Sequence, residues 1–582
     1  MAQATLKAAA LVGLLVVPFR AATWCSPSAL AASKDGRTLY AACATANRVE
    51  VVDTTQRKVV RAFPVPAPPS GLALAPDESR LYVTCAAPAS TIRVIPLKPG
   101  SRGGSIRAGH TAEAPLLSPD GKRLYVPNRF SNDVSVIDTA ARKEIGRVQV
   151  VREPMGAALS RDGKLLFVIN SVPAGRADVE YVAAEISLID TGSLKPAGRI
   201  VLPNGSAELR GIAVSPDGAL AGVTHLLARY YLPTTQVDRG WMETNALSVI
   251  DVPGRKLLAT VLLDEIDQGA ANPWAVSWTG DGKRIVVTHA GTHEVSLIEA
   301  GALVEKVRGA TRETSDDLAF LVGLRQRIKL AGNGPRALVL VGRRAYVAGY
   351  FSDTLEEIDL EQPAAAAFLR LSSAPMTTVR RGEMLFNDGS ICFQGWQSCA
   401  SCHSPDARVD GLNWDLLNDG IGNPKNVKSL LLSHRTPPAM SQGVRENAEE
   451  AVRAGIRHIL FAQRPGHEAA AIDEFLKSLQ PVPSPWLVKG KPSAAAKRGE
   501  KLFMDGCASC HPVGLYTDLK AYDVGTGGRF DTPTLVEIWR TAPYLHNGSA
   551  PTLREVLTDQ HGRTSRLTPR QLDDLLAYLL IR

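Results

Sequence analysis

The chain has 582 residues, of which 45% are hydrophobic and 21% are charged. This balance excludes a largely disordered protein, and the length predicts several domains. The 66 basic against 58 acidic residues give a net charge of +8 that is not gathered in one stretch, so we expect no nucleic-acid partner. Beyond the N-terminus we find no long apolar run, so we expect no transmembrane segment in the mature chain.

Residues 1–23 are predicted to be a signal peptide. Lys7 precedes an apolar stretch from Ala8 to Phe19, which has the length of a signal-peptide hydrophobic region and is short for a membrane span. The small residues Ala21 and Ala22 suit a cleavage site, although Arg20 beside them is unusual. A buried N-terminal strand is the alternative. The first interpretation predicts an exported, periplasmic protein.

Residues 24–362 contain a repeated pattern. A turn such as Ser-Pro-Asp-Gly precedes a short β-rich run, and a second β-rich run ends in Asp. Tyr40, Tyr82 and Tyr125 recur at a spacing of roughly 40 residues, which is typical of propeller blades with four strands each. Seven copies predict an all-β seven-bladed propeller. The pattern resembles the YVTN β-propeller repeat family, a resemblance that implies the fold and leaves the function open.

One position of the repeat carries potential metal ligands. The residue that ends the first run of successive blades is Cys43, Cys85, Asn128, Asn170, His225, His289 and Gly349. Cysteine and histidine on one ring are ligands of soft metals. The alternative is that these side chains bond to loop amides and lie too far apart to share an ion. Insertions at 171–185, 226–246 and 300–333 lengthen later blades, either to cover the C-terminal region, to contact a partner, or as plain loop variation.

Two Cys-Ala-Ser-Cys-His runs carry the clearest chemistry of the chain. Cys-x-x-Cys-His is the attachment motif of c-type haem: both thiols form thioethers with the haem, and the histidine binds the iron. We therefore predict two covalently bound haem c groups. They would be attached through Cys399, Cys402, Cys507 and Cys510, with His403 and His511 as the proximal iron ligands. Covalent haem attachment takes place outside the cytoplasm, which agrees with export. The sequence does not decide the state of Cys25, Cys43, Cys85 and Cys392.

The segments that flank the two motifs match each other. Arg381–Gly389 corresponds to Arg498–Gly506, and Arg435–Gly443 corresponds to Arg540–Gly548. These matches and helical periodicity predict two mainly α cytochrome c-like domains in tandem. The first spans residues 380–480 and the second 494–582. Linkers are predicted at 363–379, which is rich in alanine, and at 481–493, which is rich in proline.

The C-terminal segments resemble the bacterial di-haem cytochrome c peroxidases. The resemblance rests on Phe530–Leu535, Arg540–Ser549 and Thr552–Leu557 and covers about residues 376–582. A related di-haem enzyme that matures the quinone cofactor of methylamine dehydrogenase shares these motifs. The resemblance implies an oxidoreductase in which one haem meets hydrogen peroxide and the other passes electrons. By the same analogy a calcium ion lies between the two halves, although we find no local motif for it.

The distal iron ligands are where the chain departs from that family. The family's distal Met or Tyr of the second haem has no counterpart, and His561 is our candidate, which would give a bis-His iron. Residues 404–424 contain no histidine, so the first iron is expected to be open or capped differently. His458 is the candidate acid–base catalyst or distal ligand there, and Met440 competes as a distal ligand. Their alternatives are ordinary surface or core residues.

Three further residues concern the surroundings of the haems. The family's tryptophan between the haems falls at Ser441, and Trp414 and Trp539 are candidates to take its place, with core packing as the alternative. His546 is expected to be a hydrogen-bond partner and not a ligand.

The leading hypothesis is an exported, peroxidase-like di-haem oxidoreductase. The haem of His403 would react with a small oxidant such as hydrogen peroxide, and the haem of His511 would relay electrons from a small redox protein or another donor. The alternative is a non-catalytic electron-transfer protein whose propeller docks a redox partner. A third hypothesis makes the propeller itself the catalytic or metal-binding part.

Overall fold

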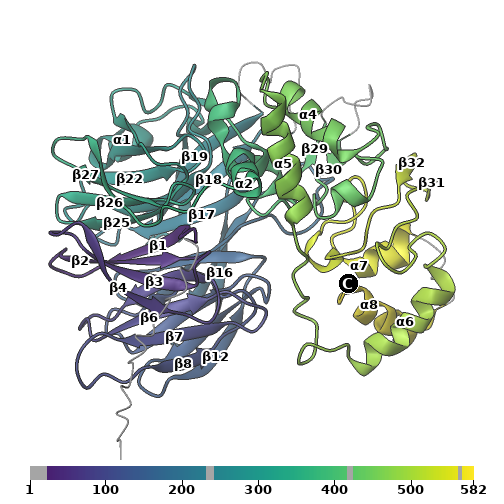
Figure 1. The fold of residues 1–582 in the computed structure, drawn as a ribbon, viewed down its shortest axis with the longest axis horizontal. Helices are drawn as coiled ribbons and strands as arrows, with labels where there is room; N and C mark the ends of the chain where they lie inside the picture. The colour runs from purple at the N-terminus through teal and green to yellow at the C-terminus, as the bar shows by residue number, and fades with distance from the viewer. Residues whose placement is uncertain (1–22, 231–241, 416–423, 562–566) are drawn as a thin grey trace, which may run out of the picture.

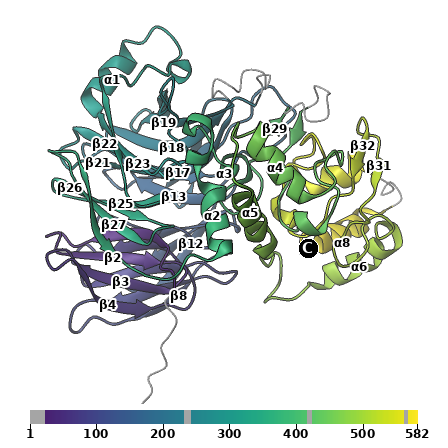
Figure 2. The same ribbon diagram turned by 45° about the horizontal axis from the view of Figure 1, so that its top comes forward.

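The computed structural model describes residues 23–230, 242–415, 424–561 and 567–582. In these residues a β-propeller of seven four-stranded antiparallel sheets is followed by a region of helices, loops and two small sheets (Figure 1). The two regions lie side by side, with α2 and α5 beside the propeller and α6 and α8 farther from it (Figures 1 and 2). The predicted seven-bladed propeller is confirmed. Among the described residues, no helix is long and apolar enough to cross a membrane.

Each blade consists of four strands in chain order, and the first strand lies innermost. β1 packs against both β5 and β25, so the last blade closes the ring against the first. The blades are β1 (Pro27–Ala32), β2 (Thr38–Cys43), β3 (Arg48–Asp53), β4 (Lys58–Pro64); β5 (Pro69–Leu74), β6 (Arg80–Cys85), β7 (Thr91–Pro96), β8 (Gly104–Arg107); β9 (Leu116–Leu117), β10 (Arg123–Asn128), β11 (Asp133–Asp138), β12 (Lys143–Gln149); β13 (Pro154–Leu159), β14 (Leu165–Asn170), β15 (Glu185–Asp190), β16 (Lys195–Val201); β17 (Ser206–Val214), β18 (Leu220–Ala228), β19 (Glu243–Asp251), β20 (Lys256–Leu262); β21 (Pro273–Trp278), β22 (Arg284–His289), β23 (Glu294–Glu299), β24 (Arg325–Lys329); β25 (Pro335–Val341), β26 (Arg344–Gly349), β27 (Thr354–Asp359), β28 (Ala365–Arg370).

The last strand, β28, lies inside the range predicted as a linker. Its alanine-rich start has low β-propensity and was therefore expected to be irregular. The strand nevertheless pairs with β27, and Phe368 and Leu371 are buried in the core that blade seven shares with blade one. Burial of these two side chains outweighs the weak local preference. The join between the two regions is therefore shorter than predicted and ends at Thr378, where α2 begins.

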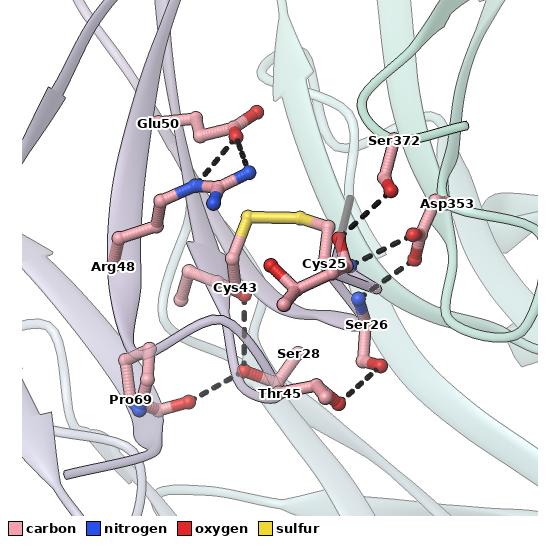
Figure 3. The surroundings of a disulfide bond; sticks show 12 residues. Cys25, Ser26, Ser28, Cys43, Thr45, Arg48, Glu50, Pro69, Asp353 and Ser372 are labelled. Carbon is pink, nitrogen blue, oxygen red and sulfur yellow. Dashed lines mark hydrogen bonds and ion pairs between the residues drawn. A yellow bond between two sulfur atoms is a disulfide. The ribbon is translucent and has the colours of Figure 1, made fainter. Parts of the chain in front are cut away.

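The N-terminal end of the propeller is held by a disulfide and a carboxylate. Cys25 forms a disulfide with Cys43 at the end of β2 (Figure 3). The backbone N–H groups of Cys25 and Ser26 each donate to Asp353 of the last blade, at 2.7 Å. These contacts tie the first blade to the seventh. Disulfides persist in oxidising compartments, so the bond agrees with the predicted export.

Removing this disulfide is expected to destabilise the propeller. The bond closes a loop with a sequence separation of 18 residues. Loops of this length contribute about 3 kcal/mol by restricting the unfolded chain. The double variant Cys25→Ala/Cys43→Ala should therefore unfold at a lower temperature, as measured by circular dichroism. A reductant should lower the midpoint of the wild type and leave that of the double variant unchanged, and equal midpoints without reductant would contradict the prediction.

The C-terminal region consists of helices and two small sheets. Its α-helices are α2 (Thr378–Asn387), α3 (Cys399–His403), α4 (Ala448–His458), α5 (Gly466–Ser478), α6 (Ala494–Gly506), α7 (Leu553–Glu555) and α8 (Pro569–Leu579), and α1 (Ala300–Arg308) belongs to the propeller. The sheets are β29 (Asn413–Trp414) with β30 (Lys425–Asn426), and β31 (Ala521–Asp523) with β32 (Arg529–Asp531). Its shorter helices are η3 (Gly389–Ile391), η4 (Phe393–Gly395), η5 (Ser433–Arg435), η6 (Ile538–Arg540) and the π-helix η7 (Val556–Gln560). A further short helix, η2 (Thr314–Asp316), belongs to the propeller.

Both halves of this region share one local architecture. α2 crosses α5, and α6 crosses α8, with a glycine at each crossing. A Cβ on Gly382 would lie 1.8 Å from the Ala471 carbonyl oxygen, and one on Gly499 would lie 1.9 Å from that of Asp574. Only glycine lets the backbones approach this closely. The loops that follow also match, since Gly443 and Gly548 both have a positive φ.

The segment between α2 and the first motif docks on the propeller. The N–H of Gly389 donates to the Gly291 carbonyl at 2.9 Å, and the N–H of Gly269 donates to that of Gln394 at 2.8 Å. The backbone carbonyl of Trp396, a residue that is 2% exposed, accepts a hydrogen bond from the side-chain amide of Asn245. This segment is the insertion that the second half lacks. Its Cys392 is buried and makes no disulfide.

Candidate functional site

The first motif forms the short helix α3, which begins at a capping box between Ser398 and Ser401. His403 ends this helix, and its Nδ1 lies 3.1 Å from the Lys428 carbonyl oxygen. A carbonyl only accepts, so Nδ1 carries the proton and Nε2 is left with a free lone pair. Desolvation lowers the pKa of His403 to about 4, which keeps the imidazole neutral. This is the state in which histidine ligates a metal.

The second motif repeats this arrangement. Nδ1 of His511 lies 2.8 Å from the Tyr516 carbonyl oxygen, and burial lowers the pKa of His511. The ring of His561 lies near that of His511. His561 follows the π-helix η7, and its backbone N–H donates to the Val556 carbonyl at 2.8 Å. The two imidazole rings have centroids 6.4 Å apart and planes at 75°.

This separation fits two histidines on one iron. With metal–nitrogen distances of about 2.0 Å and ring atoms about 1.1 Å from the ring centre, two histidines that bind one iron from either side would have centroids about 6.2 Å apart. The angle of 75° between the ring planes does not conflict with this arrangement. The residues present therefore fit a haem held between His511 and His561.

A propeller carboxyl group reaches the first motif. Glu243, the first residue of β19, places Oε1 3.7 Å from Sγ of Cys402. Asp410 lies in the same cluster, where it accepts hydrogen bonds from the Leu412 N–H at 2.9 Å and from Nε1 of Trp414 at 2.8 Å. Both carboxyl groups are only 1% exposed. The start of β19, which lies within the insertion predicted at 226–246, thus contacts the C-terminal region.

Burial sets the protonation of these two groups. It raises the pKa of Asp410 to about 7 and that of Glu243 well above its ordinary value, with Asp410 as a further cause for Glu243. Oε2 of Glu243 is buried without a hydrogen-bond partner in the part of the chain that the structure describes. A buried carboxylate without a partner is costly, so the pair holds protons near neutral pH.

Replacing Glu243 with glutamine is expected to reduce the pH dependence of stability. The folded-state pKa of Glu243 is raised, so its stabilisation is complete below about pH 4.5 and is lost as the pH rises through the folded pKa. Each pKa unit of this shift corresponds to about 1.4 kcal/mol. Thermal midpoints of wild type and Glu243→Gln at pH 5 and pH 8 measure the difference. The exposed Glu500→Gln is the control, and identical pH profiles for wild type and Glu243→Gln would contradict the prediction.

The structure places the other predicted site residues as follows. His458 is the last residue of α4 and is exposed, whereas Met440 is half-buried at a φ of 73°. Among the described residues, no hydrogen bond, ion pair or ring contact joins His458 or Met440 to His403, so their roles stay predictions. His546 stacks on Phe530 with ring centroids 3.8 Å apart, and its buried Nδ1 has no hydrogen-bond partner within the described parts of the chain. Trp539 packs against Phe130 of the propeller, with centroids 5.2 Å apart.

Ion pairs join the two halves to each other and to the propeller. Arg408, five residues after His403, pairs with Glu537 at 2.6 Å, and Arg540 pairs with Asp406 at 2.7 Å. Arg129 of the propeller also approaches Asp406, at 3.4 Å. Burial alone would raise the pKa of Asp406, but these guanidinium groups hold it well below its usual range. Arg408, Arg540 and Glu537 are buried and paired, so these pairs fix the mutual position of the three parts.

The ring of metal ligands considered for the propeller is not formed. Cys43 is in a disulfide, and Cys85 is a buried free thiol. In both His225 and His289, Nδ1 lies within hydrogen-bond distance of a backbone carbonyl and Nε2 within hydrogen-bond distance of a serine hydroxyl. The alternative, side chains that satisfy local polar groups, is correct for these two histidines. Among the described residues, potential ligand atoms gather in two groups: Cys402 with Glu243 and Asp410, and Cys25 with Cys43 and Glu50, where the disulfide leaves no free thiol.

Sequence reasoning missed Glu243, Asp410 and the partners of the motif histidines. The insertion predicted at 226–246 was the one available signal, because it contains Glu243, where β19 begins. For Asp410 and Lys428 no local pattern exists. Their importance comes from contacts between segments that are far apart in the chain.

Comparisons with known proteins support this architecture. A family model described as RoxA-like, cytochrome c-like, matches residues 529–566. The chain is 29% identical over 298 residues to hydrazine synthase subunit gamma of Kuenenia stuttgartiensis, which covers 39% of this chain and 84% of that protein. It is 28% identical over 243 residues to subunit beta from the same organism, covering 39% of this chain and 59% of that protein. A solved chain of Kuenenia stuttgartiensis hydrazine synthase has a TM-score of 0.53 at 26% identity and covers 60% of this chain and 99% of that one.

A third relative is the methylamine utilization protein MauG of Methylophilus methylotrophus. The identity is 26% over 244 residues, which covers 32% of this chain and 73% of that protein. The chain joins a seven-bladed β-propeller to a cytochrome c-like domain. These similarities support a c-type cytochrome with an oxidoreductase role and haem c as its cofactor.

Proposed function

We propose that the protein is an exported, peroxidase-like di-haem oxidoreductase. Cys399 and Cys402 would attach one haem and Cys507 and Cys510 the other, with His403 and His511 as proximal ligands. The observation that carries the proposal is the shared state of these histidines. Each bonds Nδ1 to a backbone carbonyl, which leaves the lone pair of the neutral imidazole on Nε2, as in a metal-ligating histidine.

The proposal includes two cytochrome c domains in tandem. It is supported by the matched helix crossings at Gly382 and Gly499. It is also supported by reciprocal backbone bonds between the halves. The N–H of Asn426 donates to the His546 carbonyl at 2.6 Å, and the N–H of Asp531 donates to the Ser441 carbonyl at 2.9 Å. Asn426 and Asp531 end corresponding strands, β30 and β32, so the halves exchange the same contact.

The haem of His511 is proposed to relay electrons. His561 would complete a bis-His iron, which leaves no position for an external molecule. Nitrogen ligation on both sides favours the oxidised iron more than methionine does, so this centre would have a low potential and readily give its electron away.

The haem of His403 is proposed to meet the oxidant. Haem iron supplies redox chemistry at an open coordination position. Cleaving the oxygen–oxygen bond of a peroxide also requires a proton to move from one oxygen to the other. The buried Glu243 and Asp410 hold protons beside Cys402 and are candidates for this task. His458 and Met440 remain candidates for acid–base and distal roles, respectively.

The partners follow from this chemistry. A small redox protein or another donor would supply electrons, and hydrogen peroxide is the proposed oxidant class. Periplasmic export is supported by the Cys25–Cys43 disulfide, while residues 1–22, where the signal peptide is predicted, lie outside the described residues. The calcium ion remains a prediction by analogy. Both candidate metal groups of the described residues include cysteine, whereas calcium prefers oxygen ligands.

Mass and spectra of the purified protein test the proposal. We expect a mass that includes two haem groups. In the oxidised protein we expect one low-spin iron and one high-spin iron that binds cyanide and reacts with peroxide. Two low-spin irons that refuse every small ligand would instead indicate the electron-carrier alternative. Absence of either haem would overturn the di-haem assignment.

A further inference from the structure

The carbonyl partners of the two motif histidines lie on a continuous hydrogen-bonded connection. On one side, Nδ1 of His403 bonds to the Lys428 carbonyl at 3.1 Å. On the other, Nδ1 of His511 bonds to the Tyr516 carbonyl at 2.8 Å. Lys428 belongs to the first half and Tyr516 to the second.

Two contacts complete the connection between these residues. Nζ of Lys428 lies 3.1 Å from Oδ2 of Asp531, a residue whose side chain is 5% exposed. Asp531 is covalently bonded to Thr532, and the Thr532 carbonyl accepts a hydrogen bond of 2.6 Å from Oγ1 of Thr517. Thr517 is in turn bonded to Tyr516. From ring to ring, the path therefore contains one ion pair, three hydrogen bonds and otherwise covalent bonds.

The backbone around the ion pair is held in place from both sides. Asn426, two residues before Lys428, donates its N–H to the second half, and Asp531 donates its N–H to the first half. These are the reciprocal bonds between His546 and Asn426 and between Ser441 and Asp531. The Lys428–Asp531 pair thus joins β32 to the segment that follows β30, and the backbone bonds already fix the relative position of the two, so little backbone freedom is lost in forming it.

We propose that this chain of contacts is an electron path between the proximal sides of the two haems. Lys428, Asp531 and Thr517 are its positioning residues. Electronic coupling falls more steeply across a gap in space than across a covalent or hydrogen bond, and this path contains no open gap. In each transfer one electron leaves the haem held by His511, which is oxidised, and reaches the haem held by His403, which is reduced. No bond forms or breaks.

The inference rests on the proposed di-haem function, and it adds the residues that join the two centres. It also predicts how each charge acts. Lys428 carries a positive charge on the residue whose carbonyl accepts from His403, so removing this charge favours the oxidised form of the first haem and lowers its potential. Asp531 lies in the second half, so removing its negative charge favours the reduced form of the second haem and raises its potential. Both changes lower the driving force, so each rate is compared with the rate that the measured potentials alone would give, and only a further slowing supports the path.

The test uses the full haem-loaded protein. A photoexcited flavin delivers one electron by flash, and the optical bands of the two haems follow its redistribution. We expect Lys428→Met and Asp531→Asn each to slow the redistribution by about tenfold or more beyond what the measured potentials give, while potentiometry shows shifts of opposite sign. Thr517→Val, which removes one hydroxyl from the path, should also slow it. Lys477→Met removes a lysine that pairs with Glu449 at 3.2 Å in the first half, and it should leave the rate unchanged.

The outcomes separate the inference from the function on which it rests. Rates equal to that of the wild type in Lys428→Met and Asp531→Asn would overturn the electron path while both haems are present. Slower rates that the measured shifts in potential fully account for would show an electrostatic effect and would also overturn the path. A mass or spectrum without two haems would instead overturn the proposed function, and the path with it.

Discussion

Replacing His561 with methionine is expected to raise the reduction potential of the haem held by His511, by on the order of 0.1 V or more. The ring of His561 lies opposite that of His511 with centroids 6.4 Å apart, which fits two ligands of one iron. Methionine in place of histidine favours the reduced iron, so the potential rises. Potentiometry and the low-spin optical and electron paramagnetic resonance signals measure the change.

Two further variants make this prediction specific. His561→Ala should leave one coordination position open and convert this centre to high spin. His467→Met changes an exposed histidine of α5 that contacts Arg381, and it should leave both haem spectra unchanged. Unaltered potential and spin state in both His561 variants would show that this histidine is not a ligand.

Replacing Gly382 with alanine is expected to destabilise the first helical half by about 3 kcal/mol. The added Cβ would lie 1.8 Å from the Ala471 carbonyl oxygen, a backbone atom that cannot move without separating α2 from α5. Thermal unfolding, followed through the absorbance of the haem near His403, measures the loss.

A helical glycine in open space provides the matched control. A Cβ on Gly455 in α4 would meet nothing within 4 Å. Gly455→Ala should therefore be neutral or stabilising by about 0.5–1 kcal/mol, because alanine favours the helix. If Gly382→Ala and Gly455→Ala unfolded at the same temperature, the stability of the α2–α5 pair would not depend on the close approach at Gly382.

The predictions that held were those carried by local patterns. The seven blades follow from alternating apolar runs and Asp-Gly turns that recur through residues 24–362. The matching segments around the two motifs correspond to similar helix crossings at Gly382 and Gly499, while two cytochrome c domains in tandem stay a proposal. The linker at 363–379 failed because a local preference was taken as decisive. Phe368 and Leu371 are buried by a blade that is distant in sequence, and this burial makes β28 a strand.

The amino-acid sequence alone determined the blades, the two motifs and the histidines at their ends, since each is written in neighbouring residues. Tertiary structure alone decided that Cys25 bonds to Cys43, that Glu243 of the propeller reaches Cys402, and that Lys428 of one half meets Asp531 of the other. Such pairs depend on how whole blades and helices pack. Packing energy comes from buried surface shared by distant segments, and no short stretch of sequence records which distant partner supplies it.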